Sequence, residues 1–212
     1  MKRLAIWLSL LSVPALATDP GLIAVLNAIE SRYNHAKTLQ IQFTETYTGH
    51  GRLRQHESGQ LSLRKPGRMR WDYAVPPGKL FLSDGKSVYL YTPEAKRVER
   101  MALKESEDMR APLAFLLGKL DFVKEFRDFQ MSGEAGNYLI SAKANSDKLP
   151  YADIQMLVTP GFEIRRLVVN GQDKSVLTYV FEQEKLNPAL DDRQFKFQMP
   201  AGATLVSPDI GQ

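Results

Sequence analysis

Cysteine is absent from the 212-residue sequence, and this absence excludes several kinds of site at once. The chain can form no disulfide, no Cys-ligated zinc site, no iron–sulfur cluster and no thiol nucleophile. It also lacks the acceptor cysteine through which a bacterial lipoprotein is anchored to a membrane. Common catalytic motifs are missing as well, among them G-x-S-x-G, H-E-x-x-H, the P-loop and G-x-G-x-x-G. The sequence therefore predicts a protein that is not an enzyme and that holds no metal and no cofactor.

The first seventeen residues have the pattern of a secretory signal peptide. Two cations open the segment, residues 4–13 form an apolar run too short to span a bilayer, and Ala15-Leu16-Ala17 is a small-x-small cleavage site. We predict cleavage after Ala17 and export, with residues 18–212 forming one domain; a buried N-terminal helix is the alternative. The predicted mature chain has a net charge of only +2, because the leader holds two cations and no acid. Nucleic-acid binding is therefore not expected.

An amphipathic helix is predicted directly after the cleavage site. Asp19-Pro20 is typical of an N-cap followed by proline at the first helical position. Apolar residues then recur at intervals of three or four, with polar residues on the other side: Leu22, Val25, Leu26, Ile29 and Tyr33. This spacing predicts a helix with one face to bury.

From Leu39 onward the apolar period is two, which predicts β-strands. Short alternating segments follow one another, separated by turn pairs such as Asp84-Gly85 and Asn170-Gly171. The predicted strands are 39–47, 59–64, 68–73, 79–83, 86–91, 97–101, 126–131, 137–143, 154–159, 164–170, 175–182, 195–198 and 204–206. Their order predicts one strongly curved antiparallel sheet in meander order, either a barrel or a half-barrel, with a compact sandwich as the alternative.

A short apolar segment interrupts the two sets of strands. Pro112 stands at an early helical position and Gly118 near the end of the predicted helix. The sequence between them, Leu113-Ala114-Phe115-Leu116-Leu117, contains no polar residue, so this helix must bury both of its sides. It is either a core helix between the sheet and the N-terminal helix or a cover whose second side meets something else.

Apolar faces on the first set of strands are candidates for ligand binding. Met69, Trp71 and Tyr73 share one face of their strand by parity, and Leu80 and Leu82 share a face of the next strand. Such faces are either core or the wall of a ligand cavity.

A basic turn joins two of these strands. It carries four cations within seven residues: Arg64, Lys65, Arg68 and Arg70. The turn is either a solvated hairpin tip or a docking patch for an acidic partner.

The order and spacing of these segments resemble the periplasmic outer-membrane lipoprotein carrier family (LolA-like), and the resemblance covers nearly all of the predicted mature chain. It is carried by the helix over 22–33 with the strand after it, Gln42-Phe43-Thr44, the run GQLSLRKPGRMRW over 59–71, Ser83-Asp84-Gly85-Lys86, Tyr91-Thr92-Pro93, Ala111-Pro112-Leu113 and the closing FKFQMPAG over 195–202.

The resemblance implies a mainly β fold with a helical lid (α+β). A single, highly curved antiparallel sheet would form an unclosed β-barrel, and helices would cover its concave apolar face. It also implies a monomeric periplasmic carrier that takes acylated lipoproteins from an inner-membrane ABC transporter (LolCDE-like) to an outer-membrane acceptor (LolB-like). The acyl chains would lie against the concave face and the lid: Met69, Trp71, Tyr73, Leu80, Leu82, Leu113, Phe115, Leu116 and Leu117.

The resemblance also assigns a latch to the basic turn. In the family an arginine directly before the proline of this turn holds the lid through hydrogen bonds to backbone carbonyls. Lys65 stands at that position here, and its ammonium group has three rotatable donors instead of a planar fork. We predict that Lys65 is the latch, with Arg64 on the opposite face by parity. Arg64, Arg68 and Arg70 are the candidate docking residues.

Other functions on the same scaffold stay open. One is an outer-membrane acceptor, which the missing cysteine disfavours, and another is a periplasmic sensor, which would carry a second domain. The remaining alternatives are a periplasmic binding protein for another long-chain lipid or glycolipid, and an enzyme.

Overall fold

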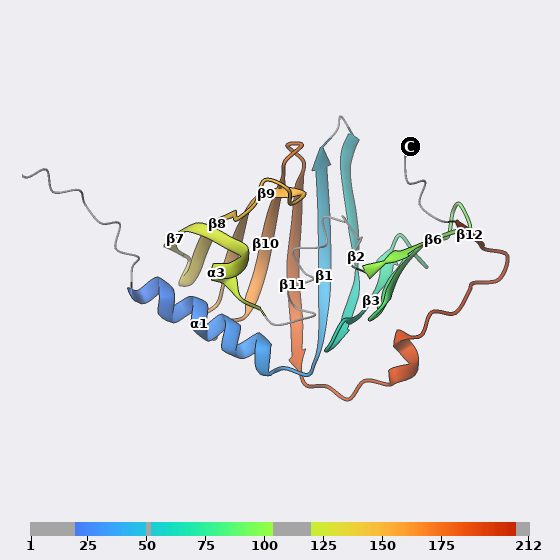
Figure 1. Cartoon of the computed structure of the whole chain (residues 1–212), viewed down its shortest axis with the longest axis horizontal. Helices are drawn as coiled ribbons and strands as arrows, with labels where there is room; N and C mark the ends of the chain where they lie inside the picture. Colours follow the sequence, from blue (N-terminus) through green and yellow to red (C-terminus); the bar gives the residue numbers. More distant parts are fainter. Residues whose placement is uncertain (1–19, 50–51, 104–119, 207–212) are drawn as a thin grey trace, which may run out of the picture.

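Twelve strands form one sheet in the order β12-β6-β5-β4-β3-β2-β1-β11-β10-β9-β8-β7 (Figure 1). The computed structural model describes residues 20–49, 52–103 and 120–206. Its strands are β1 (Thr38–Gly49), β2 (Arg52–Arg64), β3 (Arg68–Val75), β4 (Leu80–Asp84), β5 (Ser87–Thr92), β6 (Arg97–Ala102), β7 (Phe126–Glu134), β8 (Asn137–Ala144), β9 (Tyr151–Val158), β10 (Ile164–Gly171), β11 (Val176–Leu186) and β12 (Thr204–Val206). Its helices are α1 (Pro20–His35), α3 (Phe122–Glu125) and the 3₁₀ helix η3 (Asp192–Phe195).

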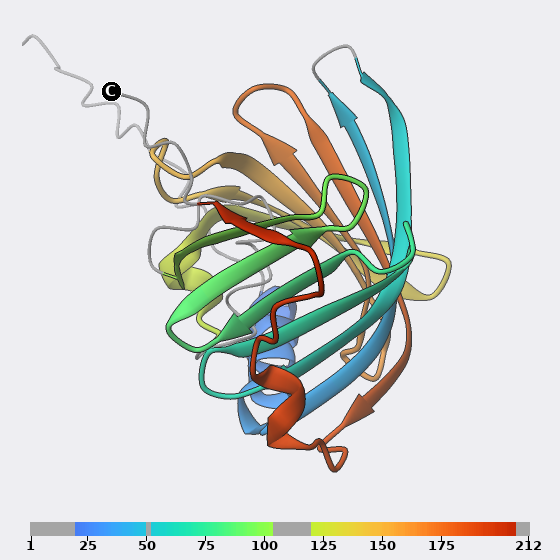
Figure 2. The same cartoon turned by 90° about the vertical axis from the view of Figure 1, so that its right-hand side faces the viewer.

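The sheet curves strongly without closing, since β12 and β7 stand at its two ends and do not pair with each other (Figures 1 and 2). Two antiparallel meanders, β1–β6 and β7–β11, meet where β1 pairs with β11. The predicted fold class is confirmed: one curved antiparallel sheet that forms an unclosed barrel, with few helices. The meander prediction is wrong at one strand, because β12 pairs with β6 in parallel.

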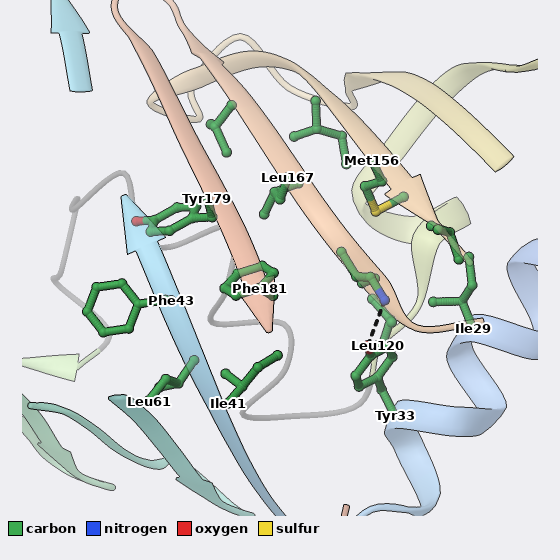
Figure 3. Close-up of a cluster of buried hydrophobic side chains, with 14 of the residues drawn as sticks. Ile29, Tyr33, Ile41, Phe43, Leu61, Leu120, Met156, Leu167, Tyr179 and Phe181 are labelled. Carbon is green, nitrogen blue, oxygen red and sulfur yellow. Dashed lines mark hydrogen bonds between the residues drawn. The ribbon is translucent and has the colours of Figure 1, made fainter. Parts of the chain in front are cut away.

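The predicted N-terminal helix is confirmed as α1, and the sheet curves around it (Figure 2). All five residues of its predicted apolar face are buried: Leu22, Val25, Leu26, Ile29 and Tyr33. They belong to one core cluster with the inward-facing residues of the strands, such as Ile41, Phe43, Met156 and Leu167 (Figure 3). The concave side of the sheet is therefore the core side.

The segment after β11 crosses the convex side of the sheet. Residues 187–206, which we call the C-terminal strap, pass over the strands β3 to β6 (Figure 2). The strand predicted at 195–198 is wrong, because Phe195 belongs to η3 and residues 196–198 form no strand. The side chain of Asp191 caps the start of η3 by accepting from the backbone N–H of Arg193 at 2.8 Å. Phe195, at the end of η3, is buried against the sheet.

Several predictions concern residues outside the described part of the chain. These are the signal peptide over residues 1–17 and the apolar helix with Leu113, Phe115, Leu116 and Leu117. Of the helices that the structure describes, none has the length and apolar character needed to cross a membrane.

Candidate functional site

The concave face of β1 to β5 is the candidate ligand-binding surface. On neighbouring antiparallel strands, residues directly opposite one another point to the same side. Trp71 lies opposite Leu61 on one neighbouring strand and Phe81 on the other, and all three belong to the core cluster. Met69 lies one level nearer the turn and is also buried. Met69, Trp71 and Tyr73 therefore share the concave face, as the parity of β3 predicts.

The prediction that Leu80 and Leu82 line the same face is wrong. Leu82 lies opposite Arg70, so it points to the convex side, and Leu80 lies opposite Asp72 on that same side. Leu82 is fully buried there, although it is not part of the concave core cluster. Phe81 takes the predicted place on the concave face. Parity within β4 is correct, but only the register with β3 shows which of its faces is concave.

Aromatic rings fill the middle of the concave face. The ring centroid of Phe43 lies 4.6 Å from that of Trp71 and 5.2 Å from that of Tyr73, both in edge-to-face geometry. Tyr179 adds a third contact, with its ring 5.6 Å from Trp71. Gly59 lies between Phe43 and Tyr73 in the register, and a Cβ atom there would come within 2.1 Å of the Asp72 carbonyl oxygen. This glycine lets β2 and β3 approach closely and leaves room for the two rings.

The concave face changes character toward the β1–β2 hairpin. Glu45 follows Phe43 on the inward side of β1, is 6% exposed, and lies opposite Glu57. The Nζ atom of Lys79 donates to the Glu57 carboxylate at 2.5 and 2.6 Å and lies 4.5 Å from the ring centroid of Tyr73. A polar end thus adjoins the aromatic middle of the face.

Helix α1 is held against β10 and β11 by a buried polar network. The Tyr33 hydroxyl donates to Glu184 Oε2 at 2.7 Å and accepts from the backbone N–H of Ile164 at 3.0 Å (Figure 3). Arg32 donates to the other carboxylate oxygen of Glu184 at 2.5 Å. Burial, and then the charge of Glu184, raise the pKa of the Tyr33 hydroxyl. The hydroxyl therefore keeps the proton that it donates.

Two further side chains of α1 bind the backbone of Leu120 and Phe122. Asn34 donates to the carbonyl oxygen of Leu120 at 2.8 Å and accepts from its backbone N–H at 2.7 Å. Glu30 accepts from the backbone N–H of Phe122 at 2.7 Å. The C-terminal half of α1 therefore positions the start of α3 as well.

Lys65, the predicted latch, contacts α1. Its Nζ atom donates to the backbone carbonyl oxygen of Tyr33 at 2.8 Å, at the last turn of the helix. Burial lowers the pKa of Lys65. Arg64 points the other way, as parity predicts, and donates to the carbonyl oxygen of Leu190 in the C-terminal strap. The last residue of β2 and the first residue of the turn thus contact segments on opposite sides of the sheet.

The arginines of the basic turn also bind the C-terminal strap. Arg64 and Arg68 pair with Asp192 at 3.2 and 2.9 Å, so this carboxylate lies between two guanidinium groups. Arg70 pairs with Asp72 and donates to the carbonyl oxygen of Gln194 at 2.9 Å. These contacts give the arginines an intramolecular role that the sequence did not indicate. Docking of an acidic partner stays a prediction.

The described residues offer no metal site, since no three His, Asp or Glu side chains among them come together as ligands. What the concave face provides is apolar area bounded by a polar end, which suits a ligand with long hydrocarbon parts.

Comparison with known proteins assigns the family. Residues 34–198 match the model of the outer membrane lipoprotein carrier protein LolA. The chain belongs to the LolA family. It is 26% identical to an outer-membrane lipoprotein carrier protein of Chromobacterium violaceum, covering 99% of this chain and 100% of that one. It is 29% identical to a protein of the same name from Dechloromonas aromatica, covering 96% and 99%.

A solved structure shares the fold of this LolA-family chain. An uncharacterized conserved protein from Thermus thermophilus matches it with a TM-score of 0.54 at 10% identity, covering 88% of this chain and 99% of the other. At this identity the likeness shows the fold alone.

Sequence reasoning missed several residues of the concave face in this LolA-family chain. Phe43, Leu61, Phe81 and Tyr179 complete the wall around Trp71. Phe43 in β1 and Tyr179 in β11 both stand at apolar positions of an alternating pattern. That alternation was the signal that could have identified them as inward-facing residues. That β1 pairs with β11 was not visible in the sequence.

Proposed function

We propose that this protein is a non-catalytic periplasmic carrier that binds the acyl chains of lipoproteins on the concave face of its sheet. The observation that carries the proposal is the apolar concave surface around Trp71, formed by residues from β1 to β4 and β11. Family membership supports it, because the relatives with this overall length are named outer-membrane lipoprotein carrier proteins.

A large apolar surface is what such cargo requires. Each buried methylene group is worth about 0.8 kcal/mol, so a single sixteen-carbon chain represents on the order of 12 kcal/mol of transfer free energy. A lipoprotein with several chains therefore crosses water at a useful rate only when a carrier covers them. The carrier must also let go, and a cover that costs free energy to open lowers the apparent affinity enough for delivery.

The proposed route runs between two membranes. The signal-peptide pattern over residues 1–17 supports export to the periplasm, and family membership supports loading by an inner-membrane ABC transporter (LolCDE-like) and unloading to an outer-membrane acceptor (LolB-like). We propose that the protein acts as a monomer, and that Leu113, Phe115, Leu116 and Leu117 belong to the lid.

Two neighbouring residues provide a matched test. Phe81 and Leu82 are both buried in β4 but point to opposite sides of the sheet. Replacing either with alanine costs about 3 kcal/mol of stability. Phe81→Ala is expected to weaken binding of a purified triacylated lipoprotein about tenfold, because contact area at the ligand is lost. Leu82→Ala is expected to leave binding per folded molecule within twofold.

Equal losses of binding in the two variants would overturn the proposal that the concave face is the binding surface. Mass spectrometry of what co-purifies with the wild-type protein from periplasm tests the cargo itself. Acylated lipoproteins are expected. A glycolipid or another long-chain lipid in their place would establish the lipid-binding alternative.

A further inference from the structure

The concave face has a polarity gradient along its strands. In the register of β1, β2 and β3, the level next to the basic turn holds Leu39, Leu63 and Met69, all buried. Three levels farther on, the same face holds Glu45 opposite Glu57. The surface is therefore apolar at the end where α1 is latched and polar toward the β1–β2 hairpin.

A buried hydrogen-bond donor lies between the two ends of the face: Trp71 is one level from Leu63 and Met69 and two levels from Glu45. Trp71 has no exposed surface, and its indole N–H finds no acceptor among the described residues. Its ring stands beside Phe43 at 4.6 Å and beside Tyr179 at 5.6 Å, and Tyr179 lies opposite Glu45 at the polar end. Leaving such a donor without an acceptor is unfavourable, because it has given up its bond to water. An acceptor carried by a ligand would remove this cost.

We infer that the concave face fixes the direction of its ligand: an acyl carbonyl oxygen accepts from the Trp71 indole, and the hydrocarbon tail runs toward Leu63 and Met69. The carbonyl group is the polar end of every ester- or amide-linked acyl chain, so that end of the chain faces Glu45 and Glu57 and the tail points away from them. This inference rests on the proposed function and adds a polar subsite to it. The groups beyond Trp71 lie beside the ligand's linker; they are Glu45, Glu57, Tyr73, Lys79 and Tyr179.

The experiment compares two synthetic lipopeptides that differ only in their chain linkage. One carries two palmitoyl chains in ester linkage on an S-glyceryl-cysteine peptide, and the other carries sixteen-carbon chains in ether linkage, which lack the carbonyl acceptor. Wild-type protein is expected to bind the ester form about fivefold more tightly, as one hydrogen bond to a buried donor allows. Trp71→Phe keeps an aromatic ring and removes the N–H, and it is expected to bind both forms within twofold of each other.

Phe43→Leu is the matched control, because it changes the size of a ring that contacts Trp71 without removing a donor. It is expected to weaken both lipopeptides equally and to keep the fivefold preference for the ester. Equal binding of the two forms by wild type, or a full preference in Trp71→Phe, would overturn the inference. Failure of wild type to bind either form would instead contradict the proposed function, so the two failures are distinguishable.

Discussion

In the half of the sheet formed by β7 to β11, the concave face is covered by α1, whereas in the half formed by β3 to β6 the C-terminal strap covers the convex face. The helix is held by a buried carboxylate, Glu184, and by a hydroxyl that contacts it. The strap is held by Phe195, by the stack of Phe197 on Tyr89 at 4.3 Å, and by arginine bonds to backbone carbonyls.

The difference shows that the two sides of the curved sheet are covered by different parts of the chain. A sheet with two apolar faces needs a cover on each. Because the strap covers the outer side of β3 and β4, residues such as Leu82 are buried without occupying the concave side. Among the described elements, α1 is fixed over the opposite half. The concave face around Trp71 belongs to the buried core cluster, and the proposed function assigns it to the acyl chains.

The largest expected effect comes from removing the anchor of the strap. Phe195 is 1% exposed, and Phe195→Ala is expected to lower the free energy of unfolding by about 3–4 kcal/mol, because it leaves a cavity against the sheet. Urea titration measures the loss. Met199→Ala is the control in the same strap, since Met199 is 48% exposed, and its effect is expected to stay below about 0.5 kcal/mol. Similar values for both variants would show that the strap is not a cover.

A smaller effect is expected at the anchor of α1. Tyr33→Phe removes the hydroxyl that bonds to the Ile164 N–H and to one oxygen of Glu184. The free energy of unfolding is expected to fall by about 2 kcal/mol at pH 7, because both groups lose a buried hydrogen bond. The control is Tyr89→Phe in the other half, whose hydroxyl is 3.4 Å from Asp84 and whose loss is expected to cost less than about 0.5 kcal/mol.

Tyr33→Phe is also expected to change the dependence of stability on pH. The pKa of Tyr33 is raised in the folded protein, so between about pH 9 and 11 the unfolded chain loses this proton and the folded one keeps it. Stability therefore falls as the pH rises through this range. In Tyr33→Phe, the free energy of unfolding is expected to fall less steeply with rising pH. Some of the fall remains, because burial raises the pKa of Tyr151 to about 12. An unchanged slope would contradict the assignment.

The smallest effect on stability is expected at the latch. Lys65→Leu removes the bond to the Tyr33 carbonyl and is expected to cost about 1 kcal/mol. If Lys65 is the latch, Lys65→Leu is expected to speed lipoprotein release about fivefold in a two-membrane transfer assay and to leave uptake within twofold. Lys86→Leu, at an exposed turn, is the control. Equal release rates for wild type and Lys65→Leu would show that this lysine is not a latch.

Local patterns predicted most of the elements and failed where distant segments meet. The 3.6-residue period identified α1 down to its buried residues, and the predicted strands include a segment of each of the twelve observed ones. Leu80 and Leu82 do share one face of β4, as predicted, but that face is the convex one. Phe81 therefore lies on the concave side, where Leu82 was expected. The strand expected at 195–198 is absent, because Phe195 ends the 3₁₀ helix η3 and residues 196–198 pair with no strand.

The sequence by itself determined which residues alternate, where the chain turns, and that one helix has a single face to bury, because these depend on neighbours within a few positions. Only the tertiary structure decided which strand faces are concave, since that depends on register across β1, β2, β3, β4 and β11. It also decided the polar partners: Glu184 lies 151 positions from Tyr33, and Leu190 lies 126 positions from Arg64. No local pattern encodes bonds of that span, because they form only when the whole sheet has curved.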